Sequence, residues 1–210
     1  MVSPILRQLD LPNLLTLTGL FSSLISAIFA IQGNFCAAVI CIMYAGLSDM
    51  LDGVVARKMK NRSELQSQVG KHLDSIVDVC SFGFVPTIFA YCFGLQDFIS
   101  ITVLIFYVGV SALRLAYFNS TGLSGDYRGE YFTGLPVTCV ALFIPLAFTA
   151  SFLLSDSTMK FVLDGVYLFL GIAMIANFKV MKVRGIWYVI FTMVGLVLTG
   201  VYSWVTIVGS

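Results

Sequence analysis

Asp49-Met50-Leu51-Asp52-Gly53-Val54-Val55-Ala56-Arg57 and, after a polar interval, Gly70-Lys71-His72-Leu73-Asp74-Ser75-Ile76-Val77-Asp78 are the runs that decide how this chain folds. They place four carboxylates at helical spacing inside apolar sequence. An acid at membrane depth costs about 2.5 to 3.5 kcal/mol on insertion scales. Four acids close together therefore need a compensating charge or a wet cavity, and a bound cation is the simplest solution.

The composition around these runs is that of an integral membrane protein. Of 210 residues, 59% are hydrophobic and 11% are charged, whereas soluble domains are about 25% charged. We expect one helical domain over residues 1–210. The net charge of +1 argues against a nucleic-acid partner. Arg7 and Asp10 lead directly into an apolar segment without a cleavage site, so we expect the first span to be retained.

Membrane-length apolar segments predict an all-α, polytopic transmembrane bundle with six to seven, possibly eight, spans. A span needs about 20 apolar residues, and this criterion gives seven candidates: 12–32, 35–57, 72–95, 98–118, 135–155, 160–178 and 185–208. The acids lie in the second and third candidates. Seven spans would place the two termini on opposite sides of the membrane.

Basic residues predict the orientation, because Lys and Arg accumulate in cytoplasmic loops. Eleven of the twelve fall on one side of the predicted spans, and Lys160 falls on the other. We therefore expect the acids at the cytoplasmic ends of spans two and three, in the cytoplasmic membrane of the cell.

Helical phase groups the acids into two stripes. Asp49, Asp52, Gly53, Ala56 and Arg57 share one helical face because they are offset by 0, 3, 4, 7 and 8. The small Gly53 and Ala56 leave room beside the carboxylates for a ligand, although close helix packing explains them as well.

Gly70, Asp74 and Asp78 repeat this spacing on the next helix. The two stripes can face each other as a cage of four carboxylates, which suits Mg²⁺, Mn²⁺ or Ca²⁺ better than zinc. Such a cage predicts metal-assisted phosphoryl or phosphate-ester chemistry, with a free carboxylate as base. The purely structural alternative is that the acids form a cluster of ion pairs with neighbouring basic residues.

The combined pattern resembles the signature of the CDP-alcohol phosphatidyltransferase family, in eight positions: Asp49, Asp52, Gly53, Ala56, Arg57, Gly70, Asp74 and Asp78. One departure is the interval from Lys58 to Val69, whose twelve residues exceed the usual family spacing. We expect this added length to fall in the connection, where it costs little. Pro12–Thr16 resembles the usual opening of the family's first helix. Three further segments resemble the serine-accepting branch of the family: Ser81–Gly83, Ala112–Asn119 and Phe132–Pro136.

The resemblance implies transfer of a phosphatidyl group from CDP-diacylglycerol to L-serine, with release of CMP. Two divalent cations, Mg²⁺ or Mn²⁺, would be held by Asp49, Asp52, Asp74 and Asp78, and Asp78 would also act as the base. Gly53, Ala56, Arg57 and Gly70 would line the CDP site. Members of the family are often homodimers, so we expect a homodimer here.

The acceptor site needs a cation for the serine carboxylate. Arg114 is the first candidate, near Asn119 at the end of an apolar helix, with Arg128 or Arg62 as substitutes. Snorkelling toward lipid headgroups is the alternative role of Arg114. Other acceptors stay open: inositol phosphate, glycerol phosphate or choline. An intramembrane prenyltransferase is a less favoured alternative, because no second aspartate-rich pair follows Asp78. A cation transporter is less favoured too, because it would leave Gly53, Ala56 and Arg57 without a role.

Overall fold

The computed structural model describes residues 3–59, 62–121, 124–126, 129–181 and 186–208. Its main helices are α1 Leu11–Ile31, α2 Phe35–Lys58, α3 Glu64–Asp78, α4 Val85–Phe93, α5 Phe98–Thr121, α6 Val140–Phe148, α7 Asp156–Ile175 and α8 Ile186–Val208. Shorter helical turns are η1 Leu6–Gln8, η2 Val79–Phe84, η3 Val137–Cys139 and η4 Thr149–Phe152, and the strands are β1 Ser124–Asp126, β2 Gly129–Thr133 and β3 Lys179–Met181.

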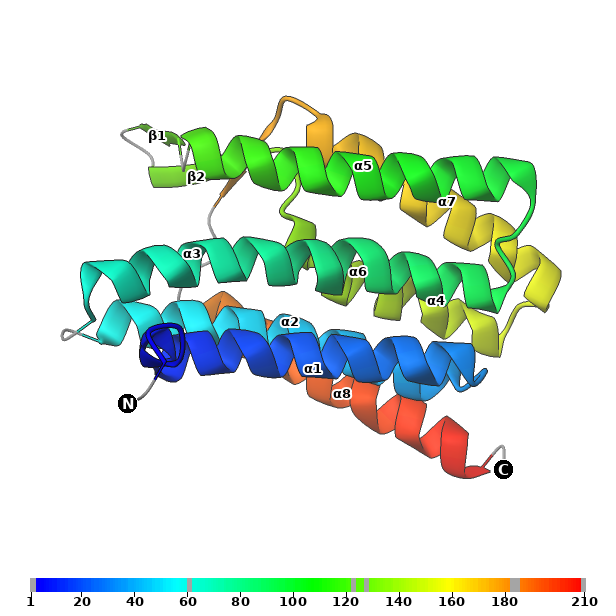
Figure 1. Cartoon of the computed structure of the whole chain (residues 1–210). Helices are drawn as coiled ribbons and strands as arrows, with labels where there is room; N and C mark the ends of the chain where they lie inside the picture. Colours follow the sequence, from blue (N-terminus) through cyan, green and yellow to red (C-terminus); the bar gives the residue numbers. More distant parts are fainter. Residues whose placement is uncertain (1–2, 60–61, 122–123, 127–128, 182–185, 209–210) are drawn as a thin grey trace.

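The helices form an up-and-down bundle, which confirms the predicted fold class (Figure 1). Among the described residues, six helices are long and apolar enough to cross a membrane. The described chain begins and ends at opposite ends of the bundle (Figure 1). Helix α2 packs against α1, α6 and α8, and α5 packs against α7.

The fifth predicted span, 135–155, is shorter and less regular than expected. The apolar helical segment there runs over Val137–Phe152 and consists of η3, α6 and η4. Pro145 lies inside α6, and a proline in a helix interior removes a main-chain hydrogen bond. The segment still runs lengthwise beside the longer helices in Figure 1.

The third predicted span begins earlier than expected. Helix α3 begins at Glu64 rather than near 72, because Ser63 and Gln66 form a capping box with reciprocal side-chain to main-chain hydrogen bonds. Most of the long interval between Arg57 and Gly70 is therefore helix instead of loop. The acid-bearing helices α2 and α3 are joined by a short connection, 59–63.

Helix α3 continues through η2 into α4, but η2 is a π-helical turn over Val79–Phe84. Pro86 follows this turn and has no amide hydrogen to donate to the carbonyl of Phe82, four residues earlier. The hydroxyl of Tyr107, on α5, donates to this carbonyl. A wide turn thus follows directly after Asp78.

Small residues and aromatic rings pack the helices of the bundle against one another. A Cβ atom added at Gly46 on α2 would lie 2.4 Å from the Cβ of Ala141 on α6, so these helices meet at a glycine. Phe35, Phe89 and Phe148 pack edge to face, with ring centroids of Phe89 and Phe148 5.1 Å apart. Because no water solvates the bilayer core, such packing is a main source of helix association there.

A small antiparallel sheet, in the order β1-β2-β3, was not expected from the sequence. In Figure 1, β1 and β2 lie beside the C-terminal end of α5. The chain leaves β2 at Gly134, whose φ of 71° favours glycine. The amides of Gly134 and Leu135 donate to the carbonyls of Phe178 and Ala173, each at 2.9 Å. These bonds join the start of the fifth segment, the apolar helical stretch Val137–Phe152 with the residues that lead into it, to the end of α7.

Candidate metal and lipid site

Three carboxylates from two helices meet at one place in the bundle. Asp49 comes from α2, and Asp74 and Asp78 come from α3 at a spacing of one helical turn. Each offers an oxygen within 4.8 Å of the others. Carboxylates this close repel one another unless a proton or a cation intervenes.

Asp78 is the most deeply placed of the three. It is 6% exposed, and among the described residues its Oδ1 atom has no hydrogen-bond partner. A buried polar atom left unsatisfied costs about 1 to 3 kcal/mol, and more when it is charged. A hard divalent cation fits this set of donors, because it would satisfy the oxygen and offset the repulsion.

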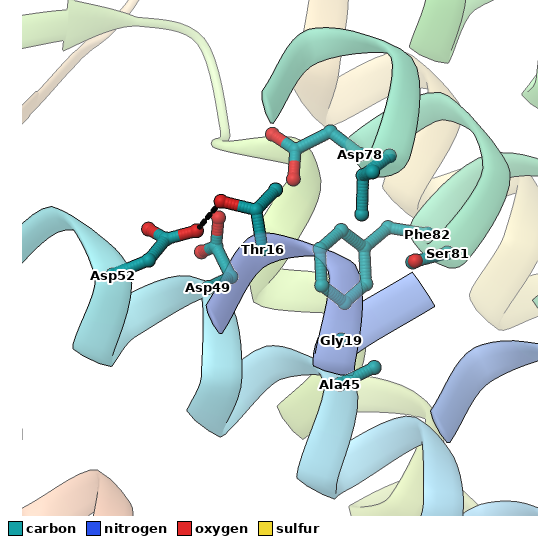
Figure 2. A pocket seen from close by; sticks show the side chains of 9 residues that line it. Thr16, Gly19, Ala45, Asp49, Asp52, Asp78, Ser81 and Phe82 are labelled. Atoms are coloured by element: carbon teal, nitrogen blue, oxygen red, sulfur yellow. Dashed lines mark hydrogen bonds between the residues drawn. The ribbon is translucent and has the colours of Figure 1, made fainter. Parts of the chain in front are cut away.

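Asp52 lies one turn from Asp49 on α2 and is also 6% exposed. Its Oδ2 atom accepts a hydrogen bond from the hydroxyl of Thr16, which α1 supplies. Figure 2 shows Asp49, Asp52 and Asp78 converging with Thr16 beside a small cavity between the helices. Asp52 thus stands beside the group of three and is oriented by a residue that the sequence analysis had not assigned to the site.

A cavity of about 600 Å³ opens onto these carboxylates. Its charged lining residues include all four aspartates together with Arg57 and Arg114, and Gly53 lines it as well. Most of the remaining wall is apolar and comes from α2, the fifth segment and α8, including Leu47, Leu142, Phe143, Phe191 and Leu196. The cavity therefore has a charged part and an extended apolar part, as an amphipathic ligand requires.

Arg114 lies on α5, is 7% exposed and lines the same cavity as the acids, which favours a site residue over a headgroup anchor. Gly53 leaves space next to Arg57: a Cβ atom added there would lie 3.6 Å from an Nη atom of the arginine, an ordinary contact. Ala56 is half-buried and does not line the cavity.

Gly70 and Asn119 also lie outside the cavity lining. A Cβ atom added at Gly70 would lie 2.5 Å from Asn13 Oδ1 and 2.6 Å from an Nη atom of Arg62. Gly70 is thus needed for close packing against these two side chains. Asn119 is exposed, and its amide donates to the hydroxyl of Ser75 at 2.7 Å.

Arg62 ties the α2–α3 connection to the start of α1. Its Nε atom lies 2.6 Å from Asp10 Oδ2, and an Nη atom donates to Asn13 Oδ1 at 2.8 Å. Asp10 also caps α1 by accepting from the amide of Asn13 at 3.0 Å. Arg62 is therefore engaged in a structural ion pair, which argues against it as the serine-binding cation. The other substitute, Arg128, lies outside the described residues.

Comparison with known proteins agrees with this arrangement. Residues 9–175 match the CDP-alcohol phosphatidyltransferase family. The chain is 35% identical over 177 residues to the archaetidylserine synthase of Methanothermobacter thermautotrophicus, covering 83% of this chain and 71% of that protein. It is 32% identical over 174 residues to the CDP-diacylglycerol–serine O-phosphatidyltransferase of Helicobacter pylori, covering 80% and 70%.

A protein of the same name from Saccharomyces cerevisiae is 32% identical over 156 residues, covering 68% of this chain and 55% of the yeast protein. The matched region contains the helices that supply all four aspartates. By its sequence and by the site that its helices assemble, the chain belongs to the CDP-alcohol phosphatidyltransferase family.

Proposed function

We propose that this chain transfers the phosphatidyl group of CDP-diacylglycerol to the hydroxyl of L-serine, giving phosphatidylserine and CMP. The observation that carries the proposal is the cavity of about 600 Å³, with carboxylates and arginines in one part and apolar side chains in the other. Such a cavity suits a lipid with a nucleotide diphosphate headgroup. The acceptor comes from the relatives, since all three of their names specify serine.

Asp49, Asp52, Asp74 and Asp78 would hold two divalent cations, Mg²⁺ or Mn²⁺. Bound there, the ions would neutralise the diphosphate and stabilise the oxygens that attack and leave. The mutual approach of Asp49, Asp74 and Asp78 within 4.8 Å supports one ion directly. The count of two rests on the family resemblance and on Asp52, which lines the same cavity.

Asp78 would act as the base. Its carboxylate takes the proton from the serine hydroxyl while the serine oxygen bonds to the phosphorus that carries the diacylglycerol. The bond from this phosphorus to the bridging oxygen of CMP breaks, and CMP leaves with the electron pair. The support for this role is the place of Asp78 as the last acid of the family pattern.

Arg57 and Gly53 would contact the diphosphate, because a guanidinium matches phosphate oxygens in a forked geometry. Arg114 would bind the serine carboxylate. Ala56 and Gly70 would complete the CDP site by packing behind it. Asn119 would border the acceptor entrance through its bond to Ser75, next in sequence to Asp74.

The test is release of CMP by the purified protein in detergent with CDP-diacylglycerol and Mn²⁺. Serine, glycerol 3-phosphate, inositol phosphate and choline are supplied in separate reactions, and lipid products are identified by mass spectrometry. We expect CMP release to depend on serine and the product to be phosphatidylserine. Release without serine, or only with another alcohol, would contradict the assignment.

The lipid part of the donor is a separate question, because one relative is named for archaetidylserine and the others for a CDP-diacylglycerol substrate. The apolar wall can accept either kind of chain. Parallel reactions with CDP-diacylglycerol and with its archaetidyl counterpart would rank the two donors by kcat/KM. We expect the diacyl donor to be preferred, and a reversed ranking would reassign the donor without changing the acceptor.

We also propose that the acid-bearing end faces the cytoplasm, in the cytoplasmic membrane. Support comes from Arg57, Lys58 and Arg62, which lie at or just beyond the end of α2, whereas Lys160 packs against Gly94 at the opposite end. The expected homodimer stays a prediction, and light scattering in detergent measures the oligomeric state.

A further inference from the structure

The direction in which the Asp74 and Asp78 side chains point depends on how α3 is rotated about its axis. An α-helix has 3.6 residues per turn, so a slip of one residue turns a helix face by about 100°. The π-helical turn η2 begins at Val79, directly after Asp78. Relaxation of this turn to α-helical geometry would rotate the acids relative to the rest of the helix.

Two tyrosines hold the chain at and after this turn. The hydroxyl of Tyr107 on α5 donates to the carbonyl of Phe82, and that of Tyr167 on α7 donates to the carbonyl of Pro86. Both tyrosines are 0% exposed. Their rings meet edge to face with centroids 5.0 Å apart, so each fixes the other.

The carbonyl of Phe82 lacks its α-helical donor. In α-helical geometry its partner would be the amide at position 86, and proline has none. A carbonyl without a donor is strongly unfavourable in a bilayer, and the Tyr107 hydroxyl supplies the donor here. Ser81, in the same turn, donates to the hydroxyl of Ser23 on α1 at 3.0 Å.

We propose that Tyr107 is a positioning residue for the carboxylate group: its hydroxyl holds the π-helical turn after Asp78, and this turn sets the rotation of α3 that aims Asp74 and Asp78 at Asp49. Tyr107 is not among the described residues that line the cavity. Tyr167 holds the chain just after this turn, at the carbonyl of Pro86. The inference rests on the metal site proposed above.

Tyr202 offers a matched control. It is also 0% exposed, and its hydroxyl donates to a main-chain carbonyl, that of Pro145, at 2.6 Å. That bond joins α8 to α6 and involves neither α3 nor η2. Tyr107→Phe and Tyr202→Phe each remove one hydroxyl from a buried ring, so both lose one buried hydrogen bond.

The experiment measures Mn²⁺ binding to each purified variant in detergent by electron paramagnetic resonance, followed by steady-state kinetics. Outer groups that orient metal ligands typically contribute about 10- to 100-fold to metal affinity. We expect Tyr107→Phe to raise the Kd for Mn²⁺ about tenfold and lower kcat, with the KM for serine unchanged. Tyr202→Phe should bind Mn²⁺ as the parent protein does.

Tyr167→Phe provides a second measurement should Tyr107→Phe fail to fold, and it should bind Mn²⁺ more weakly than Tyr202→Phe does. Equal Mn²⁺ affinity in all three variants would overturn the positioning role. Absence of Mn²⁺ binding in the parent protein would instead overturn the proposed metal site, and the inference with it.

Discussion

Thr16 shows how one hydroxyl can orient a carboxylate from another helix. It lies 36 positions before Asp52 in the chain and donates to it in the interior of the bundle. We expect Thr16→Val to weaken Mn²⁺ binding about tenfold, because groups that orient ligands have effects of this size. Thr16→Ser keeps the hydroxyl and should bind as the parent does. Titration with Mn²⁺ checks both, and equal loss in the two variants would assign Thr16 to packing alone.

Asp78 combines two proposed roles, as metal ligand and as base. Asp78→Asn should lower turnover by at least about 10²- to 10⁴-fold, the usual contribution of a positioned base, while binding of CDP-diacylglycerol largely survives. CMP release and lipid binding are the measurements. Normal turnover would remove Asp78 as base.

Asp97→Asn is the matched control for that substitution. Asp97 precedes α5 and accepts from the Ser100 hydroxyl and from the amides of Ile99 and Ser100. These hydrogen bonds, chiefly that from the Ser100 side chain, lower the pKa of Asp97. Asparagine caps a helix about as well as aspartate, so turnover should be unchanged.

Arg114 is proposed to bind the acceptor rather than the donor. Arg114→Ala should raise the KM for serine about 10- to 100-fold, since a hydrogen bond to a charged group contributes roughly 1.5 to 3 kcal/mol. The KM for CDP-diacylglycerol should change much less. Initial rates over a grid of both substrates separate the two constants, and equal effects would indicate a structural role.

At the level of single elements, the meeting of α2 and α6 at Gly46 leaves no room for a methyl group. Overpacking a core costs about 1 to 3 kcal/mol, or roughly 2 to 12 °C in the unfolding midpoint of a chain this long. Gly46→Ala should show such a loss in detergent. Gly109→Ala is the control, because a Cβ atom there meets nothing within 4 Å. Equal midpoints would show that the helices separate without cost.

The elements also show where sequence reasoning succeeds and where it stops. Hydropathy located the long helices, because 20 apolar residues have few other uses. It misplaced the start of α3, since Glu64 to Val69 is polar helix outside the apolar run; Ser63 and Gln66 carry the capping signal that would have found it. The π-helical turn depends on Tyr107, 25 residues from Phe82, and no local pattern reveals that contact.

At the scale of the whole molecule, the spacing of the acids predicted their two helical faces, and the structure brings Asp49, Asp74 and Asp78 together. Sequence spacing could not predict the partners that other helices supply. Thr16 reaches the site from α1, and Arg62 forms an ion pair with Asp10. Both pairings arise from tertiary packing of segments far apart in the chain.

The orientation of the bundle is open to a direct test. The described termini lie at opposite ends of the bundle (Figure 1). Asp49 and Asp52 lie in the half of α2 that leads into α3. Alkaline phosphatase, which is active only outside the cytoplasm, should be active when fused after Val208 and inactive when fused after Lys58. The opposite pattern would turn the proposed site toward the outside.

The division of the site among the helices also has a consequence for biosynthesis. All four carboxylates belong to α2 and α3, whereas part of the apolar wall comes from α8, much later in the chain. Because chains are synthesised from the N-terminus, the acidic centre can assemble while that side of the cavity is still open to the bilayer. The newborn protein thus passes through a stage in which the acids can already be together while the α8 side of the cavity wall is still missing.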